Sequence, residues 1–305
     1  SNPEFLREGQ ALEDFMNPDR VIVGCASDLA RQTMAKLYRP LTLMNIPILY
    51  TNPESAELIK YSANAFLAMK ISFINEMADI SEQCGANIQD IAHGIGLDHR
   101  IGPKFLQTSP GYGGSCFPKD TLALRESAAA MGAPTSIVDA VIKSNDRRKK
   151  SMADRIIKAC GKSVEGKTIG ILGLTFKPET DDMRDAVSLD IIPTLQKAGA
   201  QIIAYDPTIE NSKEHMAHNL LKDVTFAKSA YDCLEGADAL VILTEWNIFR
   251  ALDLKRVKEL LKHPLIIDLR NIYTPEEMAD AGVTYHSLGR PTIFQPLSLH
   301  ESAKV

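Results

Sequence analysis

Residues 168–178 read Thr-Ile-Gly-Ile-Leu-Gly-Leu-Thr-Phe-Lys-Pro, in which the apolar run Thr168–Leu174 leads into a turn. Amphipathic stretches such as Leu189–Ala198 and Ile248–Leu261 alternate with five further apolar runs, which are Gln201–Tyr205, Val224–Ala227, Ala239–Leu243, Leu265–Leu269 and Val283–His286. This alternation of strand and helix patterns predicts a parallel sheet covered by helices. We therefore expect an α/β fold with a Rossmann-like, doubly wound domain over residues 161–305, of which 291–305 form a loose tail.

The preceding residues, 26–160, show helical patterns. Asn52 is a suitable N-cap and Pro53 suits the first helical position, so a long helix is expected to begin there and to end near Gly85. Further helices are expected around 89–94, from 118 to 131 and over 136–160, with an irregular loop rich in glycine and proline before the second of them. Long helices of this kind commonly pack against a second subunit, so we predict a helical domain that forms a homodimer.

Residues 1–25 contain one strand pattern, Arg20–Gly24, with no strand before it. A single strand is not stable by itself. Either this strand joins a later sheet, or the sheet to which it belongs is absent from this chain.

Composition restricts the class of protein. The chain has 305 residues, 45% hydrophobic and 24% charged, and its 34 basic and 39 acidic residues give a net charge of −5. It has no basic excess for nucleic-acid binding, and no apolar run is long enough to cross a membrane. The five cysteines are odd in number and form no C-x-x-C pair, which favours a reduced, cytoplasmic protein. No histidine spacing indicates a metal site.

The turn after the first apolar run lacks the G-x-G-x-x-G pattern of dinucleotide-binding proteins. It still directs the end of a strand toward the start of a helix, which favours an anion, and Lys177 and Arg184 supply positive charge. A phosphate site and an ordinary turn with solvated charges explain this pattern equally well. Asp206 ends the second strand, where such folds often hold an acid for a ribose, but the missing glycines weaken that interpretation.

Residues 111–120 read Gly-Tyr-Gly-Gly-Ser-Cys-Phe-Pro-Lys-Asp, a glycine loop that contains a cysteine. Glycines allow the backbone to approach a ligand closely. Cys116 is expected at a helix N-terminus, where the helix dipole and Lys119 favour the thiolate, and Asp120 lies about one turn further on. We favour a nucleophilic thiol for covalent catalysis. The alternative is a small buried residue, which suits Cys84, Cys160 and Cys233 well.

Two further groups of polar residues could serve a site. Lys60 and Asn64 are four residues apart in the expected long helix and share a face, where an ammonium and an amide could stabilise an oxyanion. A solvated polar stripe explains the same spacing. Glu4 and Glu8 flank Phe5-Leu6-Arg7, although two acids near the start of a chain usually have no special role.

Four motifs occur in one order, namely Asn2–Gly9, Lys60–Phe66, Gly111–Asp120, and Phe176-Lys177 with Asp182 and Arg184. Together they resemble the UDP-glucose/GDP-mannose dehydrogenases over about residues 1–290. Asn17–Arg20 and Gly96–Leu106 are most similar to the members that oxidise UDP-glucose. Each motif alone would be unspecific, whereas the ordered set is specific.

The resemblance implies three parts: an N-terminal NAD-binding Rossmann domain, a helical dimerisation core and a C-terminal UDP-binding Rossmann-like domain. Residues 1–25 would be the end of the first part, 26–160 the second and 161–305 the third. Most of the NAD-binding domain would then be missing, about 140 residues, a size typical of one domain. This would explain the isolated strand, and the chain would be a truncated form or a gene fragment.

The family oxidises the C6 hydroxyl of UDP-glucose twice, with NAD as the cofactor, and forms UDP-glucuronate. Carried over by position, Cys116 would attack the C6 aldehyde to form a thiohemiacetal, loss of hydride would give a thioester, and water would hydrolyse it. Lys60 and Asn64 would hold the oxyanion. Asp120 would orient water or the lysine, and Glu4 would act as acid or base in the hydrolysis.

The same comparison implies which residues bind the substrate and the cofactor. Arg100 would reach the sugar from the neighbouring subunit, and Lys119 and Arg184 would lie on the NAD side. The residues expected to line the sugar site or to contact the UDP-sugar are Phe5, Leu6, Arg7, Glu8, Lys104, Tyr112, Gly113, Phe176, Lys177 and Arg270.

Other functions remain open on the sequence alone. UDP-N-acetylmannosamine and GDP-mannose dehydrogenases use the same chemistry, and a 3-hydroxyacid dehydrogenase of similar architecture needs no cysteine. In a different class, the chain would be a UDP-sugar-binding and dimerisation module without turnover, because hydride transfer needs nicotinamide held close to the reacting carbon.

Overall fold

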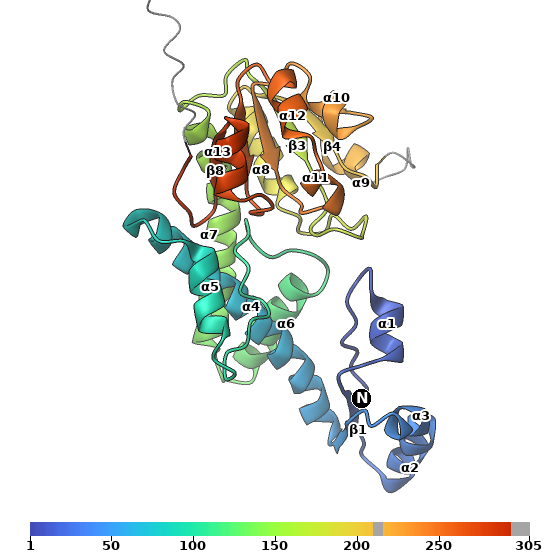
Figure 1. The fold of residues 1–305 in the computed structure, drawn as a ribbon. Coiled ribbons are helices and arrows are strands. Elements are labelled where there is room, and N and C mark those ends of the chain that lie inside the picture. The colour runs from blue at the N-terminus through green and yellow to red at the C-terminus, as the bar shows by residue number, and fades with distance from the viewer. Residues whose placement is uncertain (210–215, 294–305) are drawn as a thin grey trace, which may run out of the picture. The chain divides into compact units, whose positions relative to one another are not determined.

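The computed structural model describes residues 1–209 and 216–293, which form two compact units (Figure 1). The first unit comprises residues 1–67 and 119–135, and the second comprises 68–118 and the residues from 136 onward. The expected loose tail over 291–305 lies mostly outside the described residues, which end at 293.

The first unit contains a two-stranded parallel sheet. β1 (Val21–Gly24) pairs with β2 (Ile48–Thr51), from Val21 beside Ile48 to Gly24 beside Thr51. The strand that had no partner before it in the sequence therefore joins a later strand. The expectation that residues 26–160 are all helical is wrong at β2, because a four-residue apolar run is too short to be distinguished from part of a helix.

Local capping explains where the helices of the first unit begin. The side chain of Ser27 accepts the Ala30 N–H at the start of α2, and the side chain of Asn52 accepts the Ser55 N–H at 2.8 Å at the start of α4. The helices in this unit are α1 (Ala11–Met16), α2 (Asp28–Leu37), α3 (Arg39–Leu43), the first half of α4 (Pro53–Cys84) and most of α6 (Phe117–Ala130).

The helical part of the second unit consists of the second half of α4 with α5 (Ile88–Gly96) and α7 (Ser136–Ala159). Two small apolar clusters hold it together. One contains Ala68, Tyr112 and Val141, and the other contains Ile74, Ala78, Ile88 and Leu106. Both clusters include a residue of the loop between α5 and α6, so this loop belongs to the core and not only to the surface.

A six-stranded parallel sheet forms the rest of the second unit, in the order β5-β4-β3-β6-β7-β8. The strand order reverses between β3 and β6, as in a doubly wound Rossmann-like fold. The strands are β3 (Thr168–Leu172), β4 (Gln201–Tyr205), β5 (Val224–Phe226), β6 (Ala239–Ile242), β7 (Leu265–Asp268) and β8 (Thr284–Ser287). Five of them agree within one residue with apolar runs identified in the sequence, and β3 ends two residues before the end of its run.

Helices cover both faces of this sheet, which explains why its strands are nearly all apolar. One core contains side chains of α7 and α8 such as Met152, Ile156 and Ile191, and the other contains side chains of the later helices such as Leu234 and Phe249. The helices are α8 (Ser188–Lys197), α9 (Met216–Leu220), α10 (Ala230–Leu234), α11 (Asn247–Arg250), α12 (Leu254–Leu260) and α13 (Pro275–Ala281).

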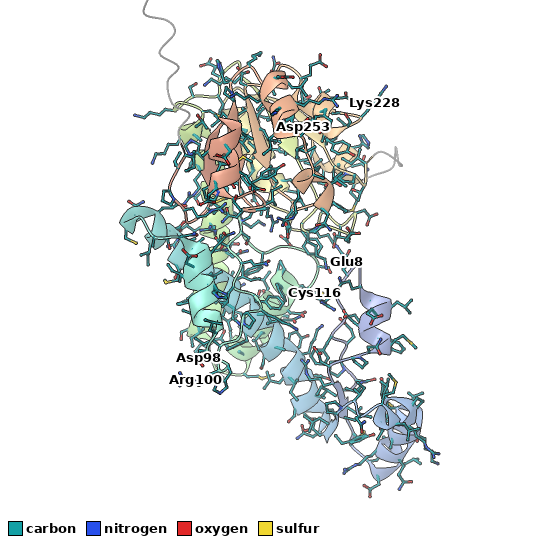
Figure 2. All side chains as sticks on the ribbon, viewed as in Figure 1. Glu8, Asp98, Arg100, Cys116, Lys228 and Asp253 are labelled. Carbon is teal, nitrogen blue, oxygen red and sulfur yellow. The ribbon has the colours of Figure 1, made fainter. Side chains whose placement is uncertain are left out.

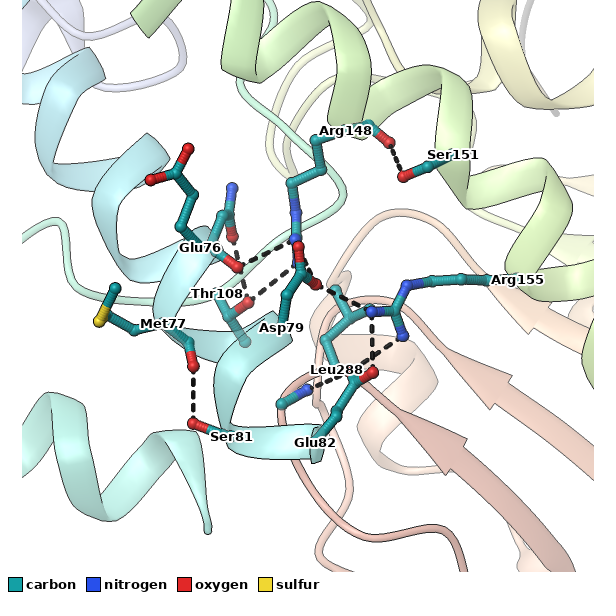
Figure 3. A network of polar contacts seen from close by, with 12 residues as sticks. Glu76, Met77, Asp79, Ser81, Glu82, Thr108, Arg148, Ser151, Arg155 and Leu288 are labelled. Carbon is teal, nitrogen blue, oxygen red and sulfur yellow. Dashed lines mark hydrogen bonds and ion pairs between the residues drawn. The ribbon is translucent and has the colours of Figure 1, made fainter. Parts of the chain in front are cut away.

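A polar network joins α4, α7 and the segment after β8 (Figure 3). The guanidinium of Arg155 lies 2.9 Å from the carboxylate of Asp79 and 2.8 Å from that of Glu82. Glu82 also accepts the Gly289 N–H at 2.8 Å. The network fixes the helical part of the second unit to its sheet. No helix in the described parts of the chain is long and apolar enough to cross a membrane.

Candidate active site

Arg270 connects the ends of three neighbouring strands of the six-stranded sheet. It follows β7 and donates from Nε to the Leu243 carbonyl at the end of β6, at 2.6 Å. It also donates from a terminal nitrogen to the Phe176 carbonyl, at 3.0 Å, in the loop that follows β3. Arg270 and Phe176, both expected at the nucleotide site, are therefore neighbours at the carboxyl edge of the sheet, where ligands bind in folds of this type.

The glycine loop packs against the same edge. The Gly114 N–H donates to the Arg184 carbonyl at 2.8 Å, and a Cβ atom on Gly114 would lie 2.7 Å from the ring of Phe176. A Cβ atom on Gly113 would lie 2.3 Å from the carbonyl oxygen of Asp185. Gly114 also has a φ of +81°, which glycine adopts without strain. Any side chain at these two positions would separate the loop from the sheet.

Cys116 follows directly in this loop and precedes the first residue of α6, so it lies at the helix N-terminus that the sequence predicts (Figure 2). Its thiol is half-buried, with Sγ at 3.6 Å from the Ser115 hydroxyl. Burial raises the pKa of Cys160 to about 11 and that of Cys233 to about 12, so these two thiols are poor nucleophiles near neutral pH. All five cysteines are free.

Lys60 and Glu4 form a pair in the first unit. The Lys60 ammonium lies 3.1 Å from the Glu4 carboxylate and donates to the Glu4 carbonyl at 2.6 Å. Partial burial raises the pKa of Glu4. The hydrogen bond from the Leu6 N–H and the charge of Lys60 lower it by a larger amount, so the pKa of Glu4 lies below its ordinary value. The ring of Phe5 lies between two cations, 4.1 Å from the Arg20 guanidinium carbon and 5.5 Å from Lys60 Nζ.

Asn64 and Asp120 form a second group in the first unit. The Asn64 amide donates to the Asp120 carboxylate at 2.6 Å, and both side chains are buried. Lys119 lies 3.6 Å from the other carboxylate oxygen, so its charge is directed at Asp120. The sequence suggests Lys60 as a possible partner of Asp120, whereas Lys60 pairs with Glu4 and Asp120 pairs with Asn64 and Lys119.

Several expected binding residues form local ion pairs at the surface. Arg7 is bidentate with Asp14, with a shortest distance of 2.5 Å. Arg100 is likewise bidentate with Asp98, at 2.5 Å (Figure 2). Arg184 is bidentate with the buried Asp182, at 2.8–3.0 Å. Leu6 and Glu8 are half-buried, and Lys104 is exposed.

Lys177 has its ammonium 5.4 Å from the ring centroid of Phe176, beside the carboxyl edge of the sheet. Asp206 directly follows β4, as the sequence indicates, but its carboxylate binds groups of the protein itself. It is buried and accepts hydrogen bonds from the Leu174 N–H at 2.7 Å and from the Trp246 indole at 3.3 Å. Asp206 thus connects two loops of the protein itself.

One contact of the glycine loop involves a residue, Asn145, that belongs to none of the sequence motifs. The side chain of Asn145 on α7 binds both peptide groups of Tyr112, a pairing that only the folded chain reveals. The sequence signal for this contact is a polar residue among the apolar positions of a long helix, and the structure buries that residue. In the described ranges, no group of three or more His, Cys, Asp or Glu side chains could hold a metal ion.

The fold and these contacts define a class: an α/β protein with a Rossmann-like nucleotide-binding sheet, whose carboxyl edge is contacted by a glycine loop that carries a thiol. Family profiles match three successive parts of the chain. They are the NAD-binding domain of the UDP-glucose/GDP-mannose dehydrogenases over residues 1–42, the central domain over 54–147 and the UDP-binding domain over 170–275. The chain belongs to the UDP-glucose/GDP-mannose dehydrogenase family.

Individual relatives agree with this assignment. The chain is 52% identical over 294 residues to a UDP-glucose 6-dehydrogenase of Rhizobium meliloti, covering 95% of this chain and 66% of the relative. It is 46% identical over 313 residues to the UDP-glucose 6-dehydrogenase TuaD of Bacillus subtilis, covering 100% and 66%. A UDP-glucose dehydrogenase structure from Pyrobaculum islandicum superposes with a TM-score of 0.81 at 34% identity, covering 91% of this chain and 61% of that one. The chain thus spans about two thirds of the length of these relatives.

Proposed function

We propose that this chain is the substrate-binding and thiol-bearing part of a UDP-glucose 6-dehydrogenase, which oxidises UDP-glucose to UDP-glucuronate in two NAD-dependent steps. The observation that carries the proposal is the packing of Gly113 and Gly114 against the loop after β3. This packing brings the segment that ends in Cys116 to the edge of the sheet where Phe176 and Arg270 lie. The relatives from Rhizobium meliloti and Bacillus subtilis described above carry this enzyme name.

The proposed chemistry is carried over by position from the resemblance to the family. The Cys116 thiolate adds to the C6 aldehyde, which forms a C–S bond and a thiohemiacetal alkoxide. Loss of the C6 hydride turns it into a thioester, and attack by water releases the carboxylate and the thiol. Lys60 and Asn64 stabilise the alkoxide, Asp120 holds the Asn64 amide in place, and Glu4 takes up and returns the proton of the attacking water.

NAD, when bound, accepts the two hydrides. Residues 1–42 match the NAD-binding profile, and β1 is followed by α2 as in a dinucleotide fold, but the turn Gly24-Cys25-Ala26-Ser27 contains one glycine. The residues present therefore fit a part of a cofactor site, and the exposed cations Lys119 and Arg184 would contribute to it. We expect negligible NAD reduction by a polypeptide of these 305 residues alone, and steady NADH production from it would contradict this expectation.

The UDP-sugar would be held by Phe176, Lys177, Arg270, Tyr112, Gly113 and Lys104. We also propose a homodimer through the helices, with Arg100 reaching the partner's sugar. The surface of α4 supports this dimer, because four large apolar side chains, spaced by eight, seven and seven residues, are each about half exposed along the helix. They are Leu58, Phe66, Phe73 and Ile80. Light scattering at micromolar concentration tests the dimer, and a monomer would contradict it.

Calorimetry with UDP-glucose, UDP-N-acetylmannosamine and GDP-mannose tests which nucleotide sugar binds most tightly to the chain. We expect UDP-glucose to bind most tightly to the chain. Preference for GDP-mannose would overturn the assignment, and preference for the N-acetylated sugar would move it to another member of the family.

Iodoacetamide labelling tests the role of Cys116. Because Cys160 and Cys233 are buried and their pKa values are raised, we expect Cys116 to react faster than either near neutral pH. UDP-glucose should slow the labelling of Cys116 and leave Cys84, which is exposed, unchanged. Equal labelling of all accessible thiols, without protection by the sugar nucleotide, would exclude Cys116 as the nucleophile.

A further inference from the structure

Three polar side chains on one face of α7 are buried. Asn145, Arg148 and Lys149 follow each other at helical spacing, and each is less than 10% exposed. The neighbouring buried positions of the helix, Val141 and Met152, are apolar. Burying a polar side chain costs free energy unless the side chain is hydrogen-bonded. The hydrogen-bond partners of these three residues therefore show what this face of the helix does.

Asn145 binds the glycine loop through both ends of its amide. Its Oδ1 accepts the Tyr112 N–H at 2.9 Å, and its Nδ2 donates to the Tyr112 carbonyl at 3.0 Å. This fixes both peptide groups of Tyr112, in the way that a neighbouring strand would. A Cβ atom on Gly111 would lie 3.0 Å from Asn145 Oδ1 and 2.7 Å from Lys149 Cγ, so the close approach requires glycine there.

Arg148 fixes an earlier part of the same loop. It donates to the Ser109 carbonyl at 2.6 Å and to the Thr108 hydroxyl at 3.3 Å, and it contacts Asp79 on α4 at 3.1 Å. Burial lowers the pKa of Arg148, and the carboxylate of Asp79 acts in the opposite direction. The start of the loop is therefore held by groups other than Asn145.

Lys149 connects α7 to α8. Its ammonium lies 3.0 Å from the carboxylate of Asp190 on α8, the helix that follows the Phe176 loop. One helix face thus holds the glycine loop through Asn145 and Arg148, and the sheet side through Lys149.

We propose that Asn145 is a positioning residue for the reaction of the proposed function, on which this inference rests. Only Gly113, Gly114 and Ser115 separate Tyr112 from Cys116, and the two glycines pack against the loop after β3. The hydrogen bonds of Asn145 fix the residue just before these glycines, on the side of the loop that faces α7. Asn145 therefore sets where the loop presents Gly113 to the UDP-sugar and Cys116 to the reacting carbon.

Asn145→Ala in the 305-residue chain tests this proposal, because it removes both hydrogen bonds. We expect binding of UDP-glucose to weaken by on the order of tenfold, the size of effect that one or two net hydrogen bonds produce. We also expect UDP-glucose to lose most of its protection of Cys116 against iodoacetamide. Both are measured at a temperature at which circular dichroism shows the variant to be folded.

Arg155→Gln is the matched control on the same helix. It breaks the ion pairs with Asp79 and Glu82 and so lowers stability, but Arg155 contacts neither of the two peptide groups of Tyr112. We expect its affinity for UDP-glucose and the protection of Cys116 to equal those of the unchanged chain. Equal losses in both variants would show that Asn145 has only a structural role and would overturn the proposal.

Gly111→Ala provides a second test through a double-mutant cycle. The added methyl group would displace the loop from Asn145 and Lys149, so it should break the same contact. If Asn145 acts through the loop, the loss of affinity in the double variant is smaller than the sum of the two single losses. Additive losses would contradict the proposal. If the unchanged chain binds no UDP-glucose, the proposed function fails instead, and the two failures are thereby distinguished.

Discussion

The two sheets of the molecule are both parallel, but they are buried very differently. In the six-stranded sheet both faces are covered, and central residues such as Ile171 and Leu172 are fully buried. In the two-stranded sheet β1 is buried, but every residue of β2 is at least partly exposed, and α1, α2 and α3 contain no buried residue. Apart from β1, the short elements of the first unit therefore depend on caps and backbone pairing, whereas side-chain packing on both faces stabilises the sheet of the second unit.

The largest difference between the two units is expected in the free energy of unfolding when one apolar side chain of each unit is truncated. Ile171→Ala should lower the free energy of unfolding of the chain by about 2–5 kcal/mol, because it leaves a cavity in a core that is closed on all sides. Leu37→Ala should change it by less than about 0.5 kcal/mol, because Leu37 is 64% exposed. Urea denaturation measures both. Similar losses would mean that the two units do not differ in packing as described.

Two glycines of the second unit have almost the same backbone angle but different surroundings. Gly114 has a φ of +81° and Gly85 a φ of +76°, but a methyl group meets the Phe176 ring at the first position and open space at the second. Gly85→Ala should therefore cost only the backbone strain, about 1–2 kcal/mol. Gly114→Ala should cost about 1–3 kcal/mol more through overpacking and should also weaken UDP-glucose binding. Thermal unfolding with calorimetry measures both, and equal effects would contradict close packing of the loop on the sheet.

The smallest effect is expected at the Lys60–Glu4 pair of the first unit. The folded-state pKa of Glu4 is lowered, so the pair stabilises the fold above the unfolded pKa of about 4.5, and this contribution disappears as the pH falls through the folded pKa. Because the Glu4 carboxylate is more than half exposed, solvent limits the contribution to less than about 1 kcal/mol. Lys60→Met should raise the pKa of Glu4, as followed by an NMR titration of its carboxyl carbon. An unchanged pKa would show that Lys60 does not stabilise the Glu4 carboxylate.

Individual elements show how far the sequence could predict the fold. The helix that begins after Asn52 and the strand Gln201–Tyr205 appear with the bounds that their patterns indicate. The stretch Ile248–Leu261 divides into α11 and α12, because Asp253 caps a new helix by accepting the Lys255 and Arg256 N–H groups. A helical period continues through such a break, so periodicity alone does not reveal it.

For the candidate site, sequence patterns were enough to predict the residue types and the local setting of Cys116 before a helix, because glycines, caps and charges act over a few residues. The folded chain was needed to show that Gly114 contacts Phe176, that Asp120 pairs with Asn64 and that Asn145 holds Tyr112. These contacts join residues 33 to 62 positions apart. Which of many polar side chains meets which distant backbone group depends on the packing of whole helices and strands, and no local pattern records that packing.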